Sequence, residues 1–172
     1  NESTFIMKIN QVIHSIDKST GGPARSATHI IQAMLDQNPK LKVDLNTNKS
    51  KSPIIKKFKT KQGVINFHKF GFIRFSKFLK QKTESSSIDI FHGHALWQYP
   101  VHQMAKIARK RNIPYIISPR GMLEPWSLTQ GELKKQLALK LFQRKDLENA
   151  ACIHATAQME VETIRQLGFT NP

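Results

Sequence analysis

Residues 6–31, IMKINQVIHSIDKSTGGPARSATHII, decide the fold class of the chain. The short apolar run at residues 6–14 predicts a strand. In residues 23–36 apolar side chains recur at helical spacing, which predicts a helix. Gly21 and Gly22 lie between these two elements, and the proline that follows them suits a first helical turn. A strand, a glycine turn and a helix in this order are typical of an α/β sheet.

The rest of the chain repeats this alternation of strands and helices. We expect further strands at residues 42–46, 64–70, 88–92, 115–118 and 152–156, and further helices at residues 74–82, 101–111, 132–149 and 158–167. Residues 47–63 are expected to form a loop. Alternating elements imply parallel strands joined by right-handed crossovers. The sequence therefore predicts an α/β, Rossmann-like, doubly wound and mainly parallel sheet with helices on both faces.

Length and composition limit the classes of protein to consider. The 172 residues suffice for one domain with its own core, which we place at residues 7–172 after a short extension at residues 1–6. Lys and Arg outnumber Asp and Glu by 27 to 12, so we expect an acidic partner. The single cysteine, Cys152, excludes a disulfide within the chain. Apolar runs are too short to span a bilayer, so we expect a soluble, cytoplasmic protein.

The glycine pair has two interpretations. Helix N-termini at the carboxyl edge of a parallel sheet favour anions, and Gly21 and Gly22 would let a phosphate or a sugar approach the backbone closely. A tight strand-to-helix turn without a ligand accounts for the same glycines equally well. The glycine patterns of dinucleotide-binding folds and of P-loops are both absent from the sequence.

Histidines mark the end of another expected strand. Residues 88–94 read IDIFHGH, which places His92 and His94 on one face where the strand ends. We expect His92 to be a packed strand residue and His94 to lie in the crevice, either as a binding residue or as a structural one. A metal site would need further ligands, and Cys152 and His154 are the only candidates. Their spacing matches no structural zinc site, so we expect no metal.

The loop SPRGMLEPW, residues 118–126, carries a cation and a large aromatic side chain. Arg120 beside a glycine suits a carboxylate or a phosphate, or a salt bridge that stiffens the loop. Trp126 would stack on a sugar ring or close the core, and we favour the core.

Four segments of the chain carry a resemblance to a known family. They are GGPARSATHII at residues 21–31, DIFHGHALW at 89–97, PYIISPRGMLEPWSL at 114–128 and CIHATAQMEVETIRQLGF at 152–169. In this order they resemble the N-terminal half of a glycosyltransferase of the GT-B fold, in the large retaining group called family four. The resemblance implies the acceptor-side domain of a two-domain enzyme, with the C-terminal donor domain absent from this chain.

The resemblance also implies an activity and site residues. Such enzymes move a sugar, usually a hexose, from a nucleotide-diphosphate sugar to a polysaccharide or lipid-linked saccharide with retention, and need no cofactor or metal. Gly21 and Gly22 would face the donor's phosphates or sugar, and His94 would contact the transferred sugar as the catalytic residue. Arg120 and Glu124 would bind substrate on the acceptor side. This chain alone is expected to be inactive and to bind nucleotide sugars no more tightly than millimolar.

A non-catalytic basic α/β module that binds an anionic membrane or nucleic acid is the alternative. The sequence has no aromatic-rich recognition strand and no recognition-helix pattern, so we expect no nucleic acid partner. Residues 49–82 carry eleven Lys or Arg and no acidic residue. This segment either rests on an anionic leaflet at the inner face of the membrane or is a solvated basic face over an ordinary core.

Overall fold

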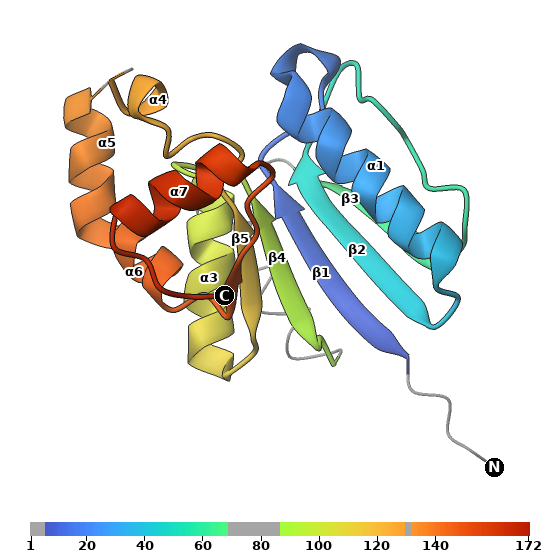
Figure 1. Ribbon diagram of the computed structural model, residues 1–172. Helices are drawn as coiled ribbons and strands as arrows, with labels where there is room; N and C mark the ends of the chain where they lie inside the picture. Colours follow the sequence, from blue (N-terminus) through green and yellow to red (C-terminus); the bar gives the residue numbers. More distant parts are fainter. Residues whose placement is uncertain (1–5, 69–86, 130–131) are drawn as a thin grey trace.

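The part of the chain that the structure describes forms a six-stranded parallel sheet flanked by helices (Figure 1). This computed structural model describes residues 6–68, 87–129 and 132–172. The strands are β1 Met7–Ile13, β2 Leu41–Asn48, β3 Gly63–His68, β4 Ile90–His94, β5 Tyr115–Ser118 and β6 Cys152–Ile153. Their order in the sheet is β3-β2-β1-β4-β5-β6, and every neighbouring pair is parallel. The predicted Rossmann-like α/β fold is confirmed.

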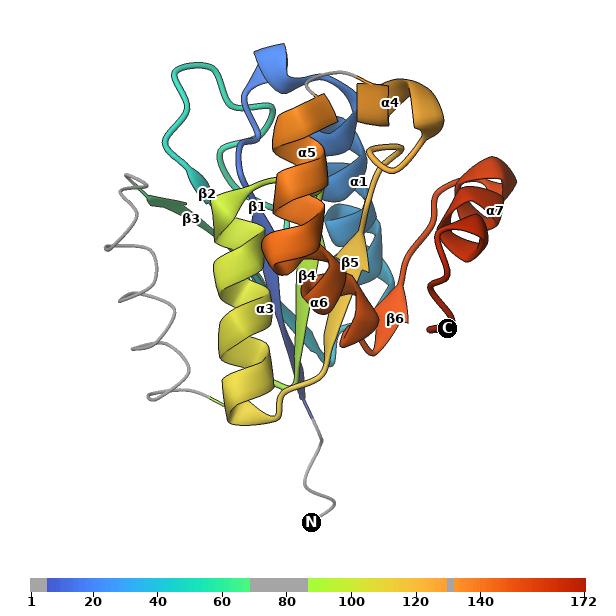
Figure 2. The same ribbon diagram turned by 90° about the vertical axis from the view of Figure 1, so that its left-hand side faces the viewer.

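Helices connect the strands on both faces of the sheet. The described helices are α1 Gly22–Gln37, α3 Tyr99–Arg111, α4 Pro125–Thr129, α5 Glu132–Ala138, α6 Arg144–Glu148 and α7 Gln158–Gln166. A 3-10 turn, Lys18–Thr20, precedes α1, and a π-helical turn, Leu139–Gln143, joins α5 to α6. Figures 1 and 2 show α1 on one face of the sheet and α3 on the other. None of the described helices is long and apolar enough to cross a membrane.

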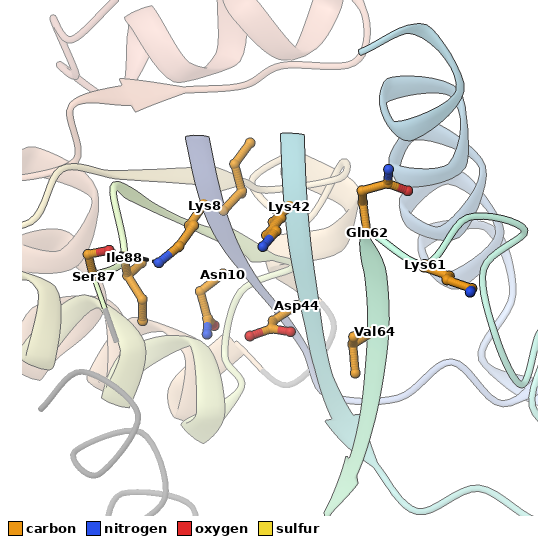
Figure 3. Close-up of a pocket in the computed structure, with 10 residues that line it drawn as sticks. Lys8, Asn10, Lys42, Asp44, Lys61, Gln62, Val64, Ser87 and Ile88 are labelled. Atoms are coloured by element: carbon orange, nitrogen blue, oxygen red, sulfur yellow. Dashed lines mark hydrogen bonds between the residues drawn. The ribbon is translucent and has the colours of Figure 1, made fainter. Parts of the chain in front are cut away.

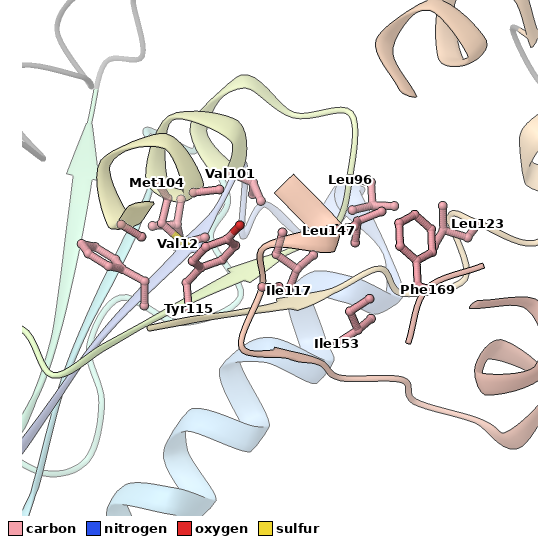
Figure 4. Close-up of a cluster of buried hydrophobic side chains, with 14 of the residues drawn as sticks. Val12, Leu96, Val101, Met104, Tyr115, Ile117, Leu123, Leu147, Ile153 and Phe169 are labelled. Carbon is pink, nitrogen blue, oxygen red and sulfur yellow. The ribbon is translucent and has the colours of Figure 1, made fainter. Parts of the chain in front are cut away.

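Alternation along the strands divides the core into two halves. In β1, Ile9 and Ile13 pack with Ile31 of α1, whereas Val12 points to the opposite face and packs with Met104 of α3. Figure 4 shows the α3 half, in which Tyr115 and Ile117 of β5 lie beneath the helix with Leu147 of α6. Apolar side chains therefore pack on both faces of β1 and β4, in the centre of the sheet.

A buried carboxylate fastens α6 to α3. Asp146 is fully buried, and its two oxygens lie 2.7 Å from His102 Nδ1 and 2.8 Å from Arg109 Nη1. The Tyr115 hydroxyl donates to the backbone carbonyl of Asp146 at 2.7 Å. A buried charge with partners on two sides costs far more to disrupt than an exposed ion pair, so these contacts fix the inner face of α6.

The structure corrects several sequence-based boundaries. β4 ends at His94 rather than residue 92, because His94 pairs with Ser118 of β5. β6 is only two residues long, and the helix expected at residues 132–149 contains a π-helical turn. The helix expected at residues 74–82 lies outside the described residues.

The prediction that Trp126 closes the core is wrong. Its side chain is 76% exposed on α4, a five-residue helix with no buried residue. Leu123, three residues earlier, is fully buried and occupies the core position at this end of the molecule.

Gly93 gives a test of how tightly β4 packs under α3. A Cβ atom at Gly93 would lie 2.7 Å from Val101 Cγ1 and 3.0 Å from Met104 Cε, closer than the packing allows. We expect Gly93→Ala to lower the free energy of unfolding by about 1–3 kcal/mol, measured by denaturant titration. Gly22→Ala is the matched control, since a Cβ there meets no atom within 4 Å. Equal stability of the two variants would contradict this packing.

Candidate functional site

The order in which the chain adds strands to the sheet reverses between β1 and β4. A hollow lies beyond the carboxyl ends of these two strands. The chain leaves β1 through α1 toward β2, and leaves β4 through α3 toward β5. Open α/β sheets bind ligands at such a switch point. The hollow measures about 240 Å³, and its lining includes Ile13, Thr20, Pro23, Ala24, Ala95 and Gln98.

The glycine pair lies at the start of α1, beside this hollow. Gly21 has φ +75° and ψ −145°, a conformation that is essentially restricted to glycine, so the turn itself accounts for it. Gly22 has no such constraint, and a Cβ at either position would meet no atom within 4 Å. Among the described residues no side chain caps α1, and its first turn holds no acidic residue. The open space at Gly22 and the uncapped helix end are therefore available to an anionic group.

Asp17 holds the loop that presents the glycines. Its carboxylate accepts hydrogen bonds from Ser19 N at 3.0 Å, Ser50 Oγ at 2.5 Å and Ser52 N at 3.0 Å. The bond from Ser50 and those from Ser19 and Ser52 lower the pKa of Asp17 well below its ordinary value. Asp17 was not expected from the sequence, although its Asp-x-Ser spacing is a signal for an Asx turn.

A hydrogen-bond chain connects four elements beneath the hollow. Gln11 Oε1 of β1 lies 2.5 Å from His94 Nε2 of β4. His94 Nδ1 lies 3.1 Å from Arg120 Nη2, in the loop after β5, and Arg120 Nη1 donates to Ser26 Oγ of α1 at 2.7 Å. Both Gln11 and His94 are fully buried. His94 and Arg120 were expected from the sequence as site residues, whereas Gln11 and Ser26 were not.

The chain of donors fixes the state of His94. A guanidinium can only donate, so Nδ1 of His94 accepts and the ring proton sits on Nε2, which donates to Gln11. Burial, with smaller contributions from His92, Arg120 and His154, lowers the pKa of His94 well below its ordinary value. His94 is therefore neutral, and both ring nitrogens have protein partners. To contact a ligand it would have to exchange one of them.

Arg120 is a half-buried cation whose partners are neutral. No carboxylate of the described residues lies within salt-bridge distance of it, and its Nε is buried without a hydrogen-bond partner. Burial lowers the pKa of its guanidinium, and the more distant Glu160 opposes this shift. The structure therefore does not show the salt bridge considered for Arg120, and its charge is free to attract an anion.

The loop that carries Arg120 is strained and tied down. Arg120 has φ +59°, and Ala95 and Trp97, which follow β4, have φ +71° and +60°. Non-glycine residues rarely adopt this region, and they cluster at functional sites. The next residue is held by Glu160 of α7, whose Oε1 accepts from the Gly121 backbone N–H at 2.5 Å.

Glu124 lies apart from the other sequence-predicted residues. Its Oε2 accepts a hydrogen bond from Thr163 Oγ1 of α7 at 3.1 Å. The structure thus connects His94 and Arg120 to α1 through Ser26, one turn beyond Gly22, whereas Glu124 contacts α7.

Three histidines cluster behind this site without metal-binding geometry. His92 Nε2 lies 2.8 Å from Ser118 Oγ, which lies 2.9 Å from His154 Nδ1, and the rings of His92 and His94 are 4.2 Å apart. Among the described residues no group of three His, Cys, Asp or Glu could hold a metal ion. The serine hydroxyl bridges two rings, which the strand pattern alone did not reveal.

A second, larger hollow of about 420 Å³ lies at the amino ends of the strands (Figure 3). Its lining includes Lys8, Asn10, Lys42 and Asp44, at the ends of the strands opposite to the start of α1. Ligands of open parallel sheets bind at the carboxyl ends. We therefore place the candidate site beside α1, although that hollow is the smaller one.

The histidine cluster predicts a loss of stability in acid. Burial, then the charges of His154 and Arg120, lower the pKa of His92 to about 3, and burial chiefly lowers that of His154. Between pH 6.5 and about 3 the unfolded chain binds protons that the folded chain does not. For His92, the free energy of unfolding should therefore decrease by up to about 1.4 kcal/mol for each unit by which the pH is lowered in this range.

Denaturant unfolding at several pH values measures this slope. His92→Gln keeps a hydrogen-bonding group opposite Ser118 but cannot titrate, so we expect a shallower slope below pH 6.5. His29→Gln, at an exposed position of α1, is the control and should leave the slope unchanged. A His92→Gln slope equal to that of the wild type would contradict the assignment.

Solved structures share this fold. A protein described as a UDP-N-acetylglucosamine 2-epimerase from Listeria monocytogenes superposes with a TM-score of 0.61 at 8% sequence identity, over 95% of this chain and 42% of that chain. S. aureus MnaA, in a structure with UDP, gives a TM-score of 0.59 at 11% identity, over 95% of this chain and 41% of that one. The chain thus spans about two fifths of the length of these neighbours, and identities this low show the fold alone.

Sequence comparisons add the family. No curated protein sequence matches the chain. The family model for the glycosyl transferase 4-like domain matches residues 67–172, which is more than half of the chain. These residues include β4, β5 and the Arg120 loop. The chain belongs to the glycosyl transferase 4-like domain family.

Proposed function

We propose that the chain is the N-terminal, acceptor-side domain of a retaining glycosyltransferase of family four. It would help to move a sugar from a nucleotide-diphosphate sugar to a polysaccharide or lipid-linked saccharide, and it would do so in the cytoplasm. The observation that carries this proposal is the open, uncapped start of α1 at Gly22, at the switch point between β1 and β4. Membership of the glycosyl transferase 4-like family supports the class of reaction.

The start of α1 and Arg120 would serve the anionic part of the substrates. Helix N–H groups and a guanidinium with neutral partners both stabilise negative charge, and a departing diphosphate is where negative charge develops. The missing side chain at Gly22 leaves room for the donor to approach the helix end. This chemistry requires no metal of its own, since the backbone and Arg120 supply the positive potential.

His94 would act through position rather than through proton transfer. Because its pKa is far below neutrality and both ring nitrogens are bonded, it is poorly suited to serve as a general base. It orients Arg120 in the free domain. Contact with the transferred sugar, as the family resemblance implies, would follow an exchange of one of these partners when substrate binds.

Chemical-shift mapping of the isotopically labelled chain tests the proposed site. With uridine and guanosine diphosphate sugars at millimolar concentration, we expect shifts at Gly21, Gly22, Ala24 and Ala95, around the hollow. Binding should be weak, because one helix end contributes only about 1 kcal/mol of attraction. Gly22→Val should abolish the shifts without unfolding the domain, since its side chain would enter open space.

Gly22→Ala, which adds a single methyl group, is the matched control and should retain most of the response. Shifts confined to the hollow at Lys8 and Lys42 would contradict the site. Micromolar affinity for any of these sugars would mean that the complete donor site lies in this domain, and would contradict the proposed division between two domains.

A further inference from the structure

Large apolar side chains form a ridge on the outer surface of α4, α5 and the π-helical turn. The exposed fractions are 76% for Trp126, 83% for Leu133, 58% for Leu137 and 69% for Leu141. We call these four residues the apolar ridge. The three leucines recur at every fourth position along one helical segment, and α4 packs against α5, with Lys135 Nζ donating to the Ser127 carbonyl. Large exposed apolar side chains on adjoining elements mark an interaction site.

The inner face of the same segment, residues 142–147, packs against the rest of the domain. Gln143 is buried and accepts a hydrogen bond from the Trp97 backbone N–H at 3.1 Å, and the Phe142 ring lies 4.6 Å from that of His102. Asp146 and Leu147 are fully buried in α6. Other residues of this segment therefore make its contacts with the core, and the ridge leucines lie on the opposite, exposed face.

Basic residues surround the ridge in the sequence. Residues 126–145 contain Lys134, Lys135, Lys140, Arg144 and Lys145 against the single acidic residue Glu132. The chain as a whole has a formal net charge of +15. Tryptophan and leucine on one face, with lysine and arginine around them, characterise helices that lie in the interface of an anionic bilayer. Two such ridges would repel each other, which disfavours a second copy of the chain as the partner.

We propose that the apolar ridge docks the domain on an anionic lipid surface. Trp126, Leu133, Leu137 and Leu141 enter the interface, and the net positive charge of the chain attracts it to anionic lipid headgroups. Figures 1 and 2 show α4 and α5 at the same end of the molecule as the start of α1. Docking therefore holds the hollow beside the lipid surface. The docking itself is independent of the proposed function, although its use, access to a lipid-linked acceptor, rests on that function.

Vesicle co-sedimentation tests the docking. The wild-type chain should bind vesicles of phosphatidylcholine with about a third phosphatidylglycerol, should bind pure phosphatidylcholine at least tenfold less, and should be released by high salt. The triple variant Leu133→Gln, Leu137→Gln, Leu141→Gln should lose about tenfold or more in partition to the anionic vesicles. Its thermal midpoint should not change, because all three side chains are exposed.

Met159→Gln is the matched control, since Met159 is an apolar residue of α7 that is 65% exposed and lies outside the ridge. It should bind as the wild type does. Equal binding by the triple variant would overturn the proposal and would leave residues 49–82 as the membrane contact. A concentration-dependent dimer in sedimentation velocity that the triple variant lacks, together with no vesicle binding, would also overturn it. Vesicle binding without any response to nucleotide sugars would retain the docking and reject the proposed function.

Discussion

A line of hydrogen bonds, buried at Gln11 and His94 and partly buried at Arg120 and Ser26, holds the candidate site together. Each member comes from a different part of the fold: β1, β4, the loop after β5, and α1. The sheet order brings these parts to one edge, because β1 and β4 are neighbours from which the chain turns to opposite sides. These hydrogen bonds hold the charged side chain of Arg120, on a strained loop, against α1.

The same line determines the electrostatics of the site. Every partner of Arg120 along it is neutral, so the positive charge is oriented without being cancelled. The uncapped end of α1 adds to this positive potential. Glu160 contributes from a distance by holding the Gly121 backbone rather than by pairing with the guanidinium. The candidate site thus carries an uncancelled positive charge, which is consistent with the proposed role of the domain.

Local patterns in the sequence were enough to predict the sheet, because apolar runs and helical spacing depend on near neighbours. They also placed Gly22, His94 and Arg120 at the ends of elements that meet at one edge. The sequence does not show which residues pair across the sheet. His94 is part of β4 because it pairs with Ser118 of β5, and the hydrogen bond from His94 to Gln11 of β1 could not be predicted from the strand pattern. Trp126 was misplaced because the sequence of the loop does not show which of its apolar side chains is buried: Leu123 is buried and Trp126 is exposed. Of the basic segment at residues 49–82, residues 69–82 lie outside the described residues.

The protonation state of His94 tests the central claim most directly. Nitrogen chemical shifts of the labelled imidazole, measured at neutral pH, distinguish the two neutral tautomers from the charged ring. The hydrogen-bond line predicts a neutral His94 with its proton on Nε2, and Gln11→Leu should disturb this signal while leaving that of the exposed His29 unchanged. A proton on Nδ1, or a charged ring, would contradict the account, because Arg120 could not then donate to His94.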